Sequence, residues 1–293
     1  MASLDQLALD AGRSFQELRR GLENYIASET PRLFPGVEEE VGYALAGGKR
    51  VRGVLTLYVA EIFGVEGAEP LAYAIELMHS ASLVHDDIVD KALERRGRES
   101  LWARYGMGDA VTLPHLMISR AVDLISRAGV DAVRDSMDAW YRAAMGQMWD
   151  TWLMEGRRVE AGYLDIVAAK TGAVFEAAVF LPLYAGGRRG LVGLAKRFGG
   201  LLGSVYQVID DLASLDGAPD SGSLVALERE AGGDPGGYAS TLLGRLLPEM
   251  MSAARRLSPR LAGFAAYTIK VFLEEAGGRV ARLVYEAAGG ALP

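Results

Sequence analysis

Two aspartate clusters contain the residues of this chain best suited to metal and phosphate chemistry. Asp86, Asp87 and Asp90 form the first cluster, and Asp210 and Asp211 form the second. Each cluster ends a long apolar stretch with helical spacing. Carboxylates are rarely placed in apolar helices unless a cation meets them. The clusters therefore predict a site for several hard cations, and such cations indicate a substrate that carries phosphate.

The first cluster has the spacing of a partial Mg²⁺ site. On a helix, Asp86 and Asp90 share a face four residues apart, and Asp87 lies three residues from Asp90. Mg²⁺ is usually held by one or two carboxylates together with water and phosphate oxygens, so an incomplete cage indicates a diphosphate ligand. The alternative interpretation is a solvated acidic helix end, which the apolar neighbours Leu83 and Val84 disfavour.

Basic segments lie on both sides of this cluster. Residues 94–98 read Glu-Arg-Arg-Gly-Arg, and residues 47–52 read Gly-Gly-Lys-Arg-Val-Arg at the head of an expected helix. Arginine makes bidentate contacts to phosphate, and the N–H groups of a helix N-terminus favour anions. A single basic loop is more often simply solvated, but the two together indicate two diphosphate sites beside one metal site.

The elements that position these residues are expected to be helices, because helical spacing recurs and strand patterns are nearly absent. The expected helices cover 3–28, 36–46, 51–63, 70–94, 101–105, 109–128, 130–155, 159–185, 191–214, 238–257, 259–276 and 279–288. Gly-Gly pairs at 47–48, 186–187, 232–233 and 277–278 predict breaks, and residues 231–237 are interpreted as a loop. We predict a single all-α domain over residues 1–293.

Composition excludes several classes of function. A net charge of −7 argues against wholesale nucleic-acid binding. The absence of cysteine excludes disulfides, thiolate catalysis and zinc–sulfur sites, and favours a reducing, cytoplasmic location. Residues 1–20 lack the pattern of a signal peptide, and no apolar run of the ~18 residues needed to span a membrane is expected.

Five motifs, in this order, resemble those of the trans-isoprenyl diphosphate synthases. They are residues 47–52, His79 with Asp-Asp-x-x-Asp at 86–90, Arg-Arg-Gly at 95–97, Lys-Thr-Gly at 170–172, and Tyr-Gln-Val-Ile-Asp-Asp at 206–211. The resemblance implies a single large helical bundle of the isoprenoid synthase type with a central cavity. The string at 79–83 and the atypical region after Ser214 are most similar to the archaeal long-chain, hexaprenyl type.

The resemblance implies head-to-tail joining of an allylic diphosphate to isopentenyl diphosphate, with two or three Mg²⁺ ions held between facing aspartate clusters. The implied metal ligands are Asp86, Asp87, Asp90, Asp210 and Asp211, with Asp87 in a supporting role. The implied ligands of the allylic diphosphate are Arg95, Lys170 and Gln207, and Thr171 would stabilise positive charge in the reacting prenyl chain. The implied ligands of isopentenyl diphosphate are Lys49, Arg52, His79 and Arg96, and Gln147 and Asp150 would line the same cavity.

Other interpretations of some residues remain open. Lys170 fits a surface lysine at a helix bend, and His79 fits a hydrogen-bonded core histidine. Gln147 and Asp150 fit polar positions on a partly exposed helix.

Product length is expected to depend on the turns that precede Asp86. A helical turn rises ~5.4 Å, which is comparable to one extended isoprene unit. Ala81 and Ser82 are small, and Met78, further down, is flexible, so a deep tunnel is expected. The predicted product has five or more isoprene units, about six (roughly C25 to C35). The alternative is that Ala81 and Ser82 only allow close helix packing.

Three departures from the family pattern leave a second interpretation open. Ser214 stands where the family usually has Asp, residues 215–244 hold one basic residue, Arg229, and Pro114-His115 replaces Gly-Asp. These changes fit a non-catalytic or product-length-setting subunit of a heteromeric synthase. A class I terpene cyclase is a third interpretation, but it has no need of a second diphosphate site.

The resemblance also implies a homodimer, with a heteromer as the alternative. The stripe of Leu113, Leu116 and Met117 would serve either the subunit contact or the protomer's own core. A long prenyl product has to reach a bilayer, so at most peripheral membrane contact is expected.

Overall fold

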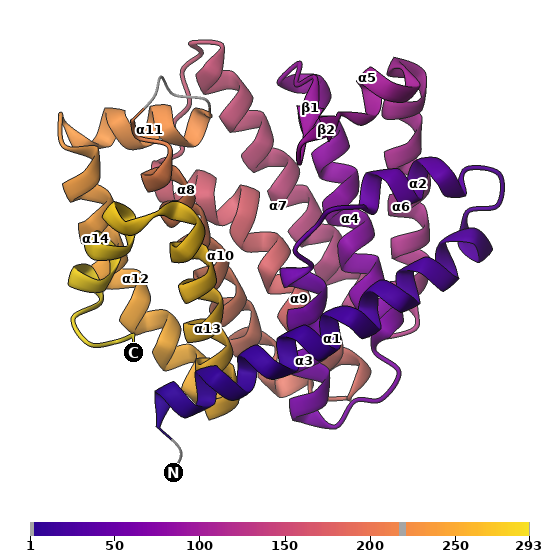
Figure 1. Ribbon diagram of the computed structural model, residues 1–293, viewed down its shortest axis with the longest axis horizontal. Coiled ribbons are helices and arrows are strands. Elements are labelled where there is room, and N and C mark those ends of the chain that lie inside the picture. Colours follow the sequence, from indigo (N-terminus) through magenta and orange to yellow (C-terminus); the bar gives the residue numbers. More distant parts are fainter. Residues whose placement is uncertain (1–2, 217–220, 293) are drawn as a thin grey trace. The chain divides into compact units, whose positions relative to one another are not determined.

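The computed structural model describes residues 3–216 and 221–292, and nearly all of its regular structure is helical, as predicted (Figure 1). The helices of the first half are α1 (Leu4–Leu33), α2 (Glu38–Leu45), α3 (Val51–Phe63), α4 (Glu69–Val89), α5 (Leu101–Tyr105), α6 (Met107–Ser126) and α7 (Val130–Met154). Those of the second half are α8 (Tyr163–Val167), η1 (Ala168–Gly172), α9 (Ala173–Ala185), η2 (Arg189–Leu191), α10 (Val192–Ala213), α11 (Gly222–Ala231), α12 (Pro235–Leu257), α13 (Pro259–Ala276) and α14 (Gly278–Ala288).

The helix expected over 70–94 is shorter than predicted, because residues 94–99 form a hairpin. Strands β1 (Glu94–Arg95) and β2 (Arg98–Glu99) pair antiparallel around Arg96 and Gly97. Both turn residues have positive φ, 54° and 73°, as a two-residue turn with the twist of a hairpin requires. Asn-Gly and Asp-Gly are the pairs that usually mark such a turn, so the Arg-Gly pair did not predict this hairpin.

Two other helix boundaries and one additional helix correct the prediction. Helix α1 continues to Leu33, and the Thr30 hydroxyl in its last turns lies 2.7 Å from the hydroxyl of Tyr73. Helix α11 was not predicted; the Ser221 hydroxyl caps it by accepting from the Leu224 N–H. Helix α12 begins at Pro235, so the loop expected over 231–237 is shorter, and Asp234 caps this helix.

One predicted helix contains a widened turn. The stretch expected over 159–185 consists of α8, the π-helical turn η1 and α9. Such π-turns are rare and occur frequently at functional sites. The turn holds Lys170 and Thr171, two of the residues assigned to substrate by the sequence motifs.

The chain divides into two compact units, neither of them continuous in sequence. The first unit comprises Met1–Ser14, Ser136–Phe180 and Gly190–Pro293, and the second comprises Phe15–Asp135 and Leu181–Arg189. The single domain predicted over 1–293 stays a prediction. The aspartates of residues 86–90 belong to the second unit and those of residues 210–211 to the first.

In the second unit, α4 packs against α2, α3, α5 and α6 (Figure 1). Helix α3 is buried on most of its circumference, as expected for a helix that is hydrophobic all round. A Cβ atom built on Gly53 of α3 would lie 2.9 Å from Cγ of Glu76 on α4, so only glycine fits here without a shift of its neighbours. This contact brings the start of α3 against the middle of α4.

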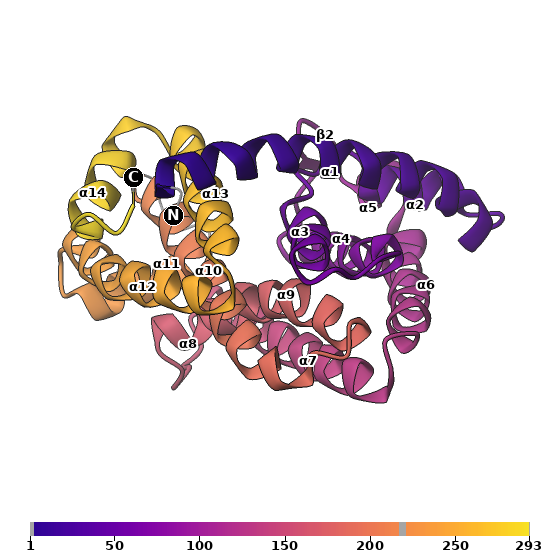
Figure 2. The same ribbon diagram turned by 90° about the horizontal axis from the view of Figure 1, so that it is seen from below.

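In the first unit, α10 contacts α8, η1, α12, α13 and α14 (Figure 2). Glycines allow the closest approach. A Cβ atom on Gly203 of α10 would lie 2.8 Å from Cα of Gly172 in η1. The backbone of α10 therefore meets the π-turn directly, and this fixes the height at which Gln207, one turn further along α10, lies beside that turn.

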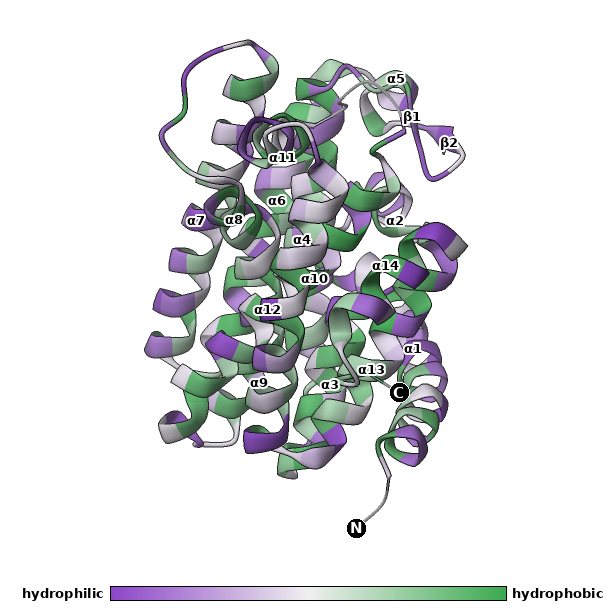
Figure 3. Ribbon diagram, turned by 90° about the vertical axis from the view of Figure 1, so that its left-hand side faces the viewer, coloured by the Kyte–Doolittle hydropathy of each residue, from purple (hydrophilic) through white to green (hydrophobic). Residues whose placement is uncertain are grey.

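Helix hydropathy differs along the chain, as Figure 3 shows: α9 is mostly hydrophobic, whereas hydrophilic residues recur along α7. The stretch Tyr163–Ala185 is long and apolar enough to cross a membrane, contrary to the expectation from sequence. However, 78% of its most apolar window is buried within the protein, as is usual for a core helix.

Candidate active site

The last turn of α4 carries the first aspartate cluster. Asp86 is half-buried, Asp87 is buried at 3% exposure, and Asp90 is exposed at the C-cap. The Asp90 N–H donates to the Asp86 carbonyl at 2.8 Å, so the helical register that places these two carboxylates on one face continues to the end of the cluster.

Asp87 binds a hairpin arginine. The Arg95 Nε atom donates to Asp87 Oδ1 at 2.7 Å, and the Trp102 indole N–H donates to the Asp87 carbonyl at 3.1 Å. Burial raises the pKa of the Asp87 carboxyl, and the Arg95 guanidinium opposes that rise. Asp87 thus anchors Arg95, and Asp86 and Asp90 are the more exposed carboxylates of the cluster.

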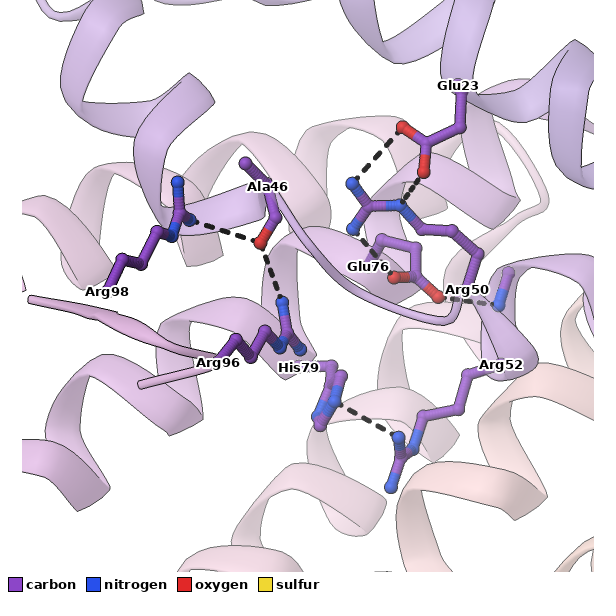
Figure 4. A network of polar contacts seen from close by, with 9 residues as sticks. Glu23, Ala46, Arg50, Arg52, Glu76, His79, Arg96 and Arg98 are labelled. Atoms are coloured by element: carbon purple, nitrogen blue, oxygen red, sulfur yellow. Dashed lines mark hydrogen bonds and ion pairs between the residues drawn. The ribbon is translucent and has the colours of Figure 1, made fainter. Parts of the chain in front are cut away.

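The hairpin also contacts the end of α2. Arg96 Nη1 and Arg98 Nη2 both donate to the Ala46 carbonyl, at 3.0 and 3.1 Å (Figure 4). Arg98 also donates to the Tyr43 carbonyl. These are the last carbonyls of a helix, where cations are favourable. The arrangement holds two guanidinium groups beside the Gly-Gly-Lys-Arg turn that follows α2.

Backbone strain is concentrated around this cluster. In the described part of the chain, the non-glycine residues with positive φ are Arg50, Lys91 and Arg96. A left-handed conformation costs such residues about 1–2 kcal/mol, and strain of this kind clusters at functional sites. All three are cations in the segments that flank the aspartates.

His79 is surrounded by cationic groups. Its Nε2 atom lies 3.1 Å from Nη1 of Arg52 (Figure 4). A guanidinium only donates, so Nε2 accepts and the imidazole proton is on Nδ1. Burial lowers the pKa of His79 well below its usual value, and Arg52, Arg96, Arg50 and Arg95 lower it further. The arginines create a positive field that a multiply charged anion would neutralise.

The second cluster has the same division between a buried and an exposed aspartate. Asp210 is exposed, whereas Asp211 is buried and accepts from the Tyr163 hydroxyl at 2.7 Å, Gln207 Nε2 at 3.0 Å and the Ser223 hydroxyl at 3.1 Å. Burial raises the pKa of Asp211 to about 6, and the three donors oppose the rise.

The substrate residues predicted on η1 belong to the same polar network. The Thr171 hydroxyl donates to Gln207 Oε1 at 2.8 Å, and Lys170 Nζ lies 3.2 Å from Asp150 Oδ2. Gly146 of α7 makes this arrangement possible, because a Cβ atom there would lie 2.4 Å from the Lys170 backbone nitrogen. Gln147, beside it, is half-buried, and its Oε1 atom has no hydrogen-bond partner.

The donor set fits Mg²⁺ that is shared with a phosphate ligand. Within residues 3–216 and 221–292, no three or more His, Asp or Glu side chains gather into a metal cage. Mg²⁺ prefers oxygen ligands and commonly takes one or two carboxylates together with phosphate and water. Asp86 and Asp90 of the second unit are carboxylates of this kind, and Asp210 of the first unit is another.

The sequence profile described as "Polyprenyl synthetase" matches residues 35–223. The chain belongs to the polyprenyl synthetase family. It is 32% identical over 182 residues to geranylfarnesyl diphosphate synthase of Methanosarcina mazei, covering 61% of this chain and 62% of that protein. It is 33% identical over 172 residues to hexaprenyl pyrophosphate synthase of Saccharolobus solfataricus, covering 58% and 59%. The match thus spans less than two thirds of the length of these polyprenyl synthetases.

Solved structures support the predicted fold. A geranyltranstransferase from Thermotoga maritima has a TM-score of 0.74 at 27% identity, covering 89% of this chain and 99% of that one. A polyprenyl synthase from Caulobacter crescentus, complexed with calcium and isoprenyl diphosphate, has a TM-score of 0.62 at 23% identity, covering 98% and 92%. The helical fold of polyprenyl synthetases is therefore confirmed.

The residues that depart from the polyprenyl synthetase pattern have the following positions and contacts in the structure. Ser214 is the C-cap of α10, and Asp216, beyond it, pairs with Arg279 at 3.0 Å. Arg229 donates to the carbonyls of Val159 and Ala161 at 3.4 Å. Residues 217–220 of the lysine-poor segment lie outside the described residues. Pro114 lies inside the continuous helix α6, and the ring of its neighbour His115 is 5.9 Å from that of His85.

The residues expected to set product length lie on α4. Ala81 and Met78 are buried, and the Ser82 hydroxyl donates to the His79 carbonyl at 2.8 Å.

Sequence reasoning missed the roles of Arg50, Glu76, Tyr163 and Ser223. The available signal for Arg50 was its place in the Gly-Gly-Lys-Arg motif, whereas the others give no signal in a single sequence.

Proposed function

We propose that this chain is a Mg²⁺-dependent trans-prenyltransferase that condenses an allylic diphosphate with isopentenyl diphosphate. The observation that carries the proposal is the arrangement of residues on α4. His79, which contacts the Arg52 guanidinium, precedes Asp86 and Asp90 by two to three turns of this helix. A field of several arginines next to accessible carboxylates suits a diphosphate and a divalent cation together. The relatives of this chain include a geranylfarnesyl diphosphate synthase and, in Mycobacterium tuberculosis, a nonaprenyl diphosphate synthase, which supports this class of reaction.

In the proposed reaction, the C1–O bond of the allylic diphosphate breaks and its electron pair leaves with the diphosphate. The double bond of isopentenyl diphosphate supplies the electrons for the new carbon–carbon bond to C1. A proton is then lost from the joined product to the departing diphosphate. Bound Mg²⁺ would neutralise the charge that develops on the leaving group.

The residues divide by the ligand that they would bind. Lys49, Arg52, His79 and Arg96 would bind isopentenyl diphosphate. Arg95, Lys170 and Gln207 would bind the allylic diphosphate. Asp87 supports this assignment of Arg95, because the ion pair fixes the guanidinium through Nε. The bond from Thr171 to Gln207 orients the threonine oxygen, whose dipole would stabilise positive charge at C1.

The product is proposed to be a trans-polyprenyl diphosphate of about six isoprene units, because the side chains about one turn before Asp86, Ala81 and Ser82, are small.

We further propose that the enzyme is a homodimer and is located in the cytoplasm. Leu116, Val111 and Met107 of α6 are large apolar side chains with 43–49% exposure, which favours a subunit contact there. Leu113 and Met117 of the same stripe are buried in the protomer. Light scattering of the purified protein and cell fractionation test these two statements.

The function is tested with purified protein, Mg²⁺, labelled isopentenyl diphosphate and farnesyl or geranylgeranyl diphosphate, followed by sizing of the lipid product. The expected result is Mg²⁺-dependent polyprenyl diphosphate that is lost in Asp86→Asn. The matched control is Asp123→Asn, an exposed aspartate of α6, which should keep the activity.

Ser214 favours a second candidate, because its neutral hydroxyl is a weaker Mg²⁺ ligand than a carboxylate. In that case the chain is a non-catalytic or length-setting subunit of a heteromeric synthase. A folded protein that makes no product from any starter would support the subunit, and cyclic hydrocarbon from the allylic substrate alone would support a cyclase.

A further inference from the structure

Arg50 is a buried arginine in the middle of the basic turn that begins α3. It is 3% exposed, and its guanidinium lies between two carboxylates from different helices (Figure 4). Nε donates to Glu23 Oε1 of α1 at 2.9 Å, and Nη1 donates to Glu76 Oε2 of α4 at 3.3 Å. The Arg50 guanidinium is therefore engaged by protein carboxylates, although its neighbours in sequence are assigned to diphosphate.

Glu76 has two roles in this contact. While Oε2 accepts from Arg50, Oε1 accepts from the Gly53 N–H at 2.8 Å. Gly53 is the third residue of α3, so its N–H is one of the donors that lack a partner within the helix. The carboxylate of α4 thus caps the N-terminus of α3, a role usually taken by the residue before a helix. Glu76 is 2% exposed, so both contacts are made away from water.

The backbone of Arg50 gives the turn its direction. Its φ and ψ are 60° and 23°, a left-handed conformation that costs an arginine about 1–2 kcal/mol. The strain persists because the ion pairs with Glu76 and Glu23 hold the side chain in place. On either side of Arg50, Lys49 is exposed and Arg52, at the second position of α3, is half-buried.

Glu76 and His79 lie three residues apart on one face of α4. Through Glu76 this face holds Arg50, and through His79 it contacts Arg52 at 3.1 Å. The spacing of the two arginines therefore depends on one turn of α4. Burial lowers the pKa of Arg50, but Glu76 and Glu23 more than offset this and raise it. The pair of carboxylates neutralises the charge of Arg50.

We propose that Arg50 and Glu76 are positioning residues for the diphosphate of isopentenyl diphosphate. This inference rests on the proposed function. Neither residue touches the substrate; together they fix the turn so that Lys49 and Arg52 are held where the diphosphate binds. A displacement of this turn weakens binding of isopentenyl diphosphate and leaves the ionisation of the allylic diphosphate unaffected.

The decisive variant is Glu76→Gln. It keeps the size of the side chain and an oxygen for the Gly53 N–H, but places an amide against the Arg50 guanidinium. We expect the KM for isopentenyl diphosphate to rise about tenfold, while kcat and the KM for the allylic diphosphate change by less than about twofold. Arg50→Lys keeps the charge but loses the fork that reaches both carboxylates, and should act in the same direction.

The control is Glu29→Gln, which removes a carboxylate of α1 that pairs with the exposed Arg32. It should leave both KM values within about twofold of the wild type. If Glu76→Gln does not fold, Glu23→Gln replaces it, since Glu23 is half-exposed and only the outer contact is lost. A smaller rise in the same KM is then expected.

The inference is overturned if folded variants show unchanged KM values, or if kcat and both KM values change together in proportion to lost thermal stability. Failure of the proposed function gives a different result: wild-type protein then makes no prenyl product. In that case isothermal titration with isopentenyl diphosphate still tests the positioning role. Unchanged affinity in Glu76→Gln overturns it, and so does absence of binding to the wild type.

Discussion

Lys170 and Asp150 form an ion pair that joins the π-turn to α7, with 3.2 Å between Nζ and Oδ2. The other carboxylate oxygen of Asp150 accepts from the Ser223 N–H at the start of α11, at 3.0 Å. A Cβ atom on Gly222 would lie 2.1 Å from the Asp150 carbonyl oxygen, so α11 meets α7 at this point. Asp150, predicted from sequence to line the substrate cavity, thus connects three elements that bear on the position of Lys170.

Asp150→Asn should destabilise the protein and weaken binding of the allylic diphosphate. Asp150 is 4% exposed, and the amide that replaces its carboxylate cannot neutralise the charge of Lys170. Lys170 is partly exposed, so water compensates for part of the lost ion pair. We expect a loss of about 1–3 kcal/mol in the free energy of unfolding, measured by urea denaturation. The KM for the allylic substrate should rise as well.

Asp138→Asn on the same helix is the matched control. Asp138 pairs with Arg142 one turn later but is 58% exposed, so its loss should change stability by less than about 1 kcal/mol. Equal effects of the two substitutions would contradict a special role for Asp150.

Gly146→Ala should displace the π-turn. Its new methyl group would lie 2.4 Å from the Lys170 nitrogen and 2.7 Å from its Cα, both of them backbone atoms that cannot rotate away. We expect a loss of about 1–3 kcal/mol in stability and a marked loss of turnover. Gly21→Ala in α1 is the control, because no atom outside the local helix backbone lies within 4 Å of the added carbon. That variant should gain up to about 1 kcal/mol in thermal denaturation. Similar behaviour of the two alanine variants would exclude the steric explanation.

Tyr163→Phe and Ser223→Ala should be energetically coupled through Asp211. Each removes a hydroxyl that donates to the buried carboxylate, and each alone should cost about 1–3 kcal/mol. In the double variant the losses should depart from additivity by about 0.5 kcal/mol or more. Urea denaturation of the four proteins measures this coupling. Tyr238→Phe, whose hydroxyl donates to exposed Glu230, should change stability by less than about 0.5 kcal/mol. Strict additivity would show that Asp211 does not connect the two hydroxyls.

The sequence predicted helices well where apolar periodicity and glycine breaks agreed. The bounds of α3 and α5 matched those expected, and the four Gly-Gly pairs all lie at or beside helix ends. The prediction failed where a tertiary contact decides the local structure. The hairpin at 94–99 depends on arginines that bind Ala46, Tyr43 and Asp87, and α11 begins where its first turn contacts Asp150.

The site was predictable in its residue types but not in its hydrogen bonds. Spacing identified Asp86 and Asp87 together, but it could not say that the second would be buried against Arg95. Likewise Glu76 looks like any glutamate of an amphipathic helix. Its two contacts become visible only when α3 is packed against α4, because its partners lie 23 and 26 residues away in sequence.

The stability of the protein without ligands should depend on His79 at mildly acidic pH. Burial and nearby arginines hold the folded-state pKa of His79 well below 6.5, the value for an unperturbed histidine. Below that value the unfolded chain binds a proton that the folded chain does not, so stability is lost as pH falls through 6.5. His79→Gln should reduce the dependence of the unfolding free energy on pH by up to about 1.4 kcal/mol per pH unit. Urea denaturation between about pH 5 and about pH 8 measures the difference. Parallel curves for the two proteins would contradict the assignment.

Ala81→Phe should shorten the product of the proposed reaction. Ala81 is fully buried on α4, five residues before Asp86, and one helical turn is comparable in length to one isoprene unit. An aromatic ring here would close the space below the carboxylates, so the lipid product should lose one or more units when sized by chromatography. Because a larger side chain in a core costs about 1–3 kcal/mol, circular dichroism has to show that the variant folds. Ser82→Phe, at a half-buried position beside it, provides a second test with less strain. If both folded variants gave the wild-type product, these residues would serve helix packing instead.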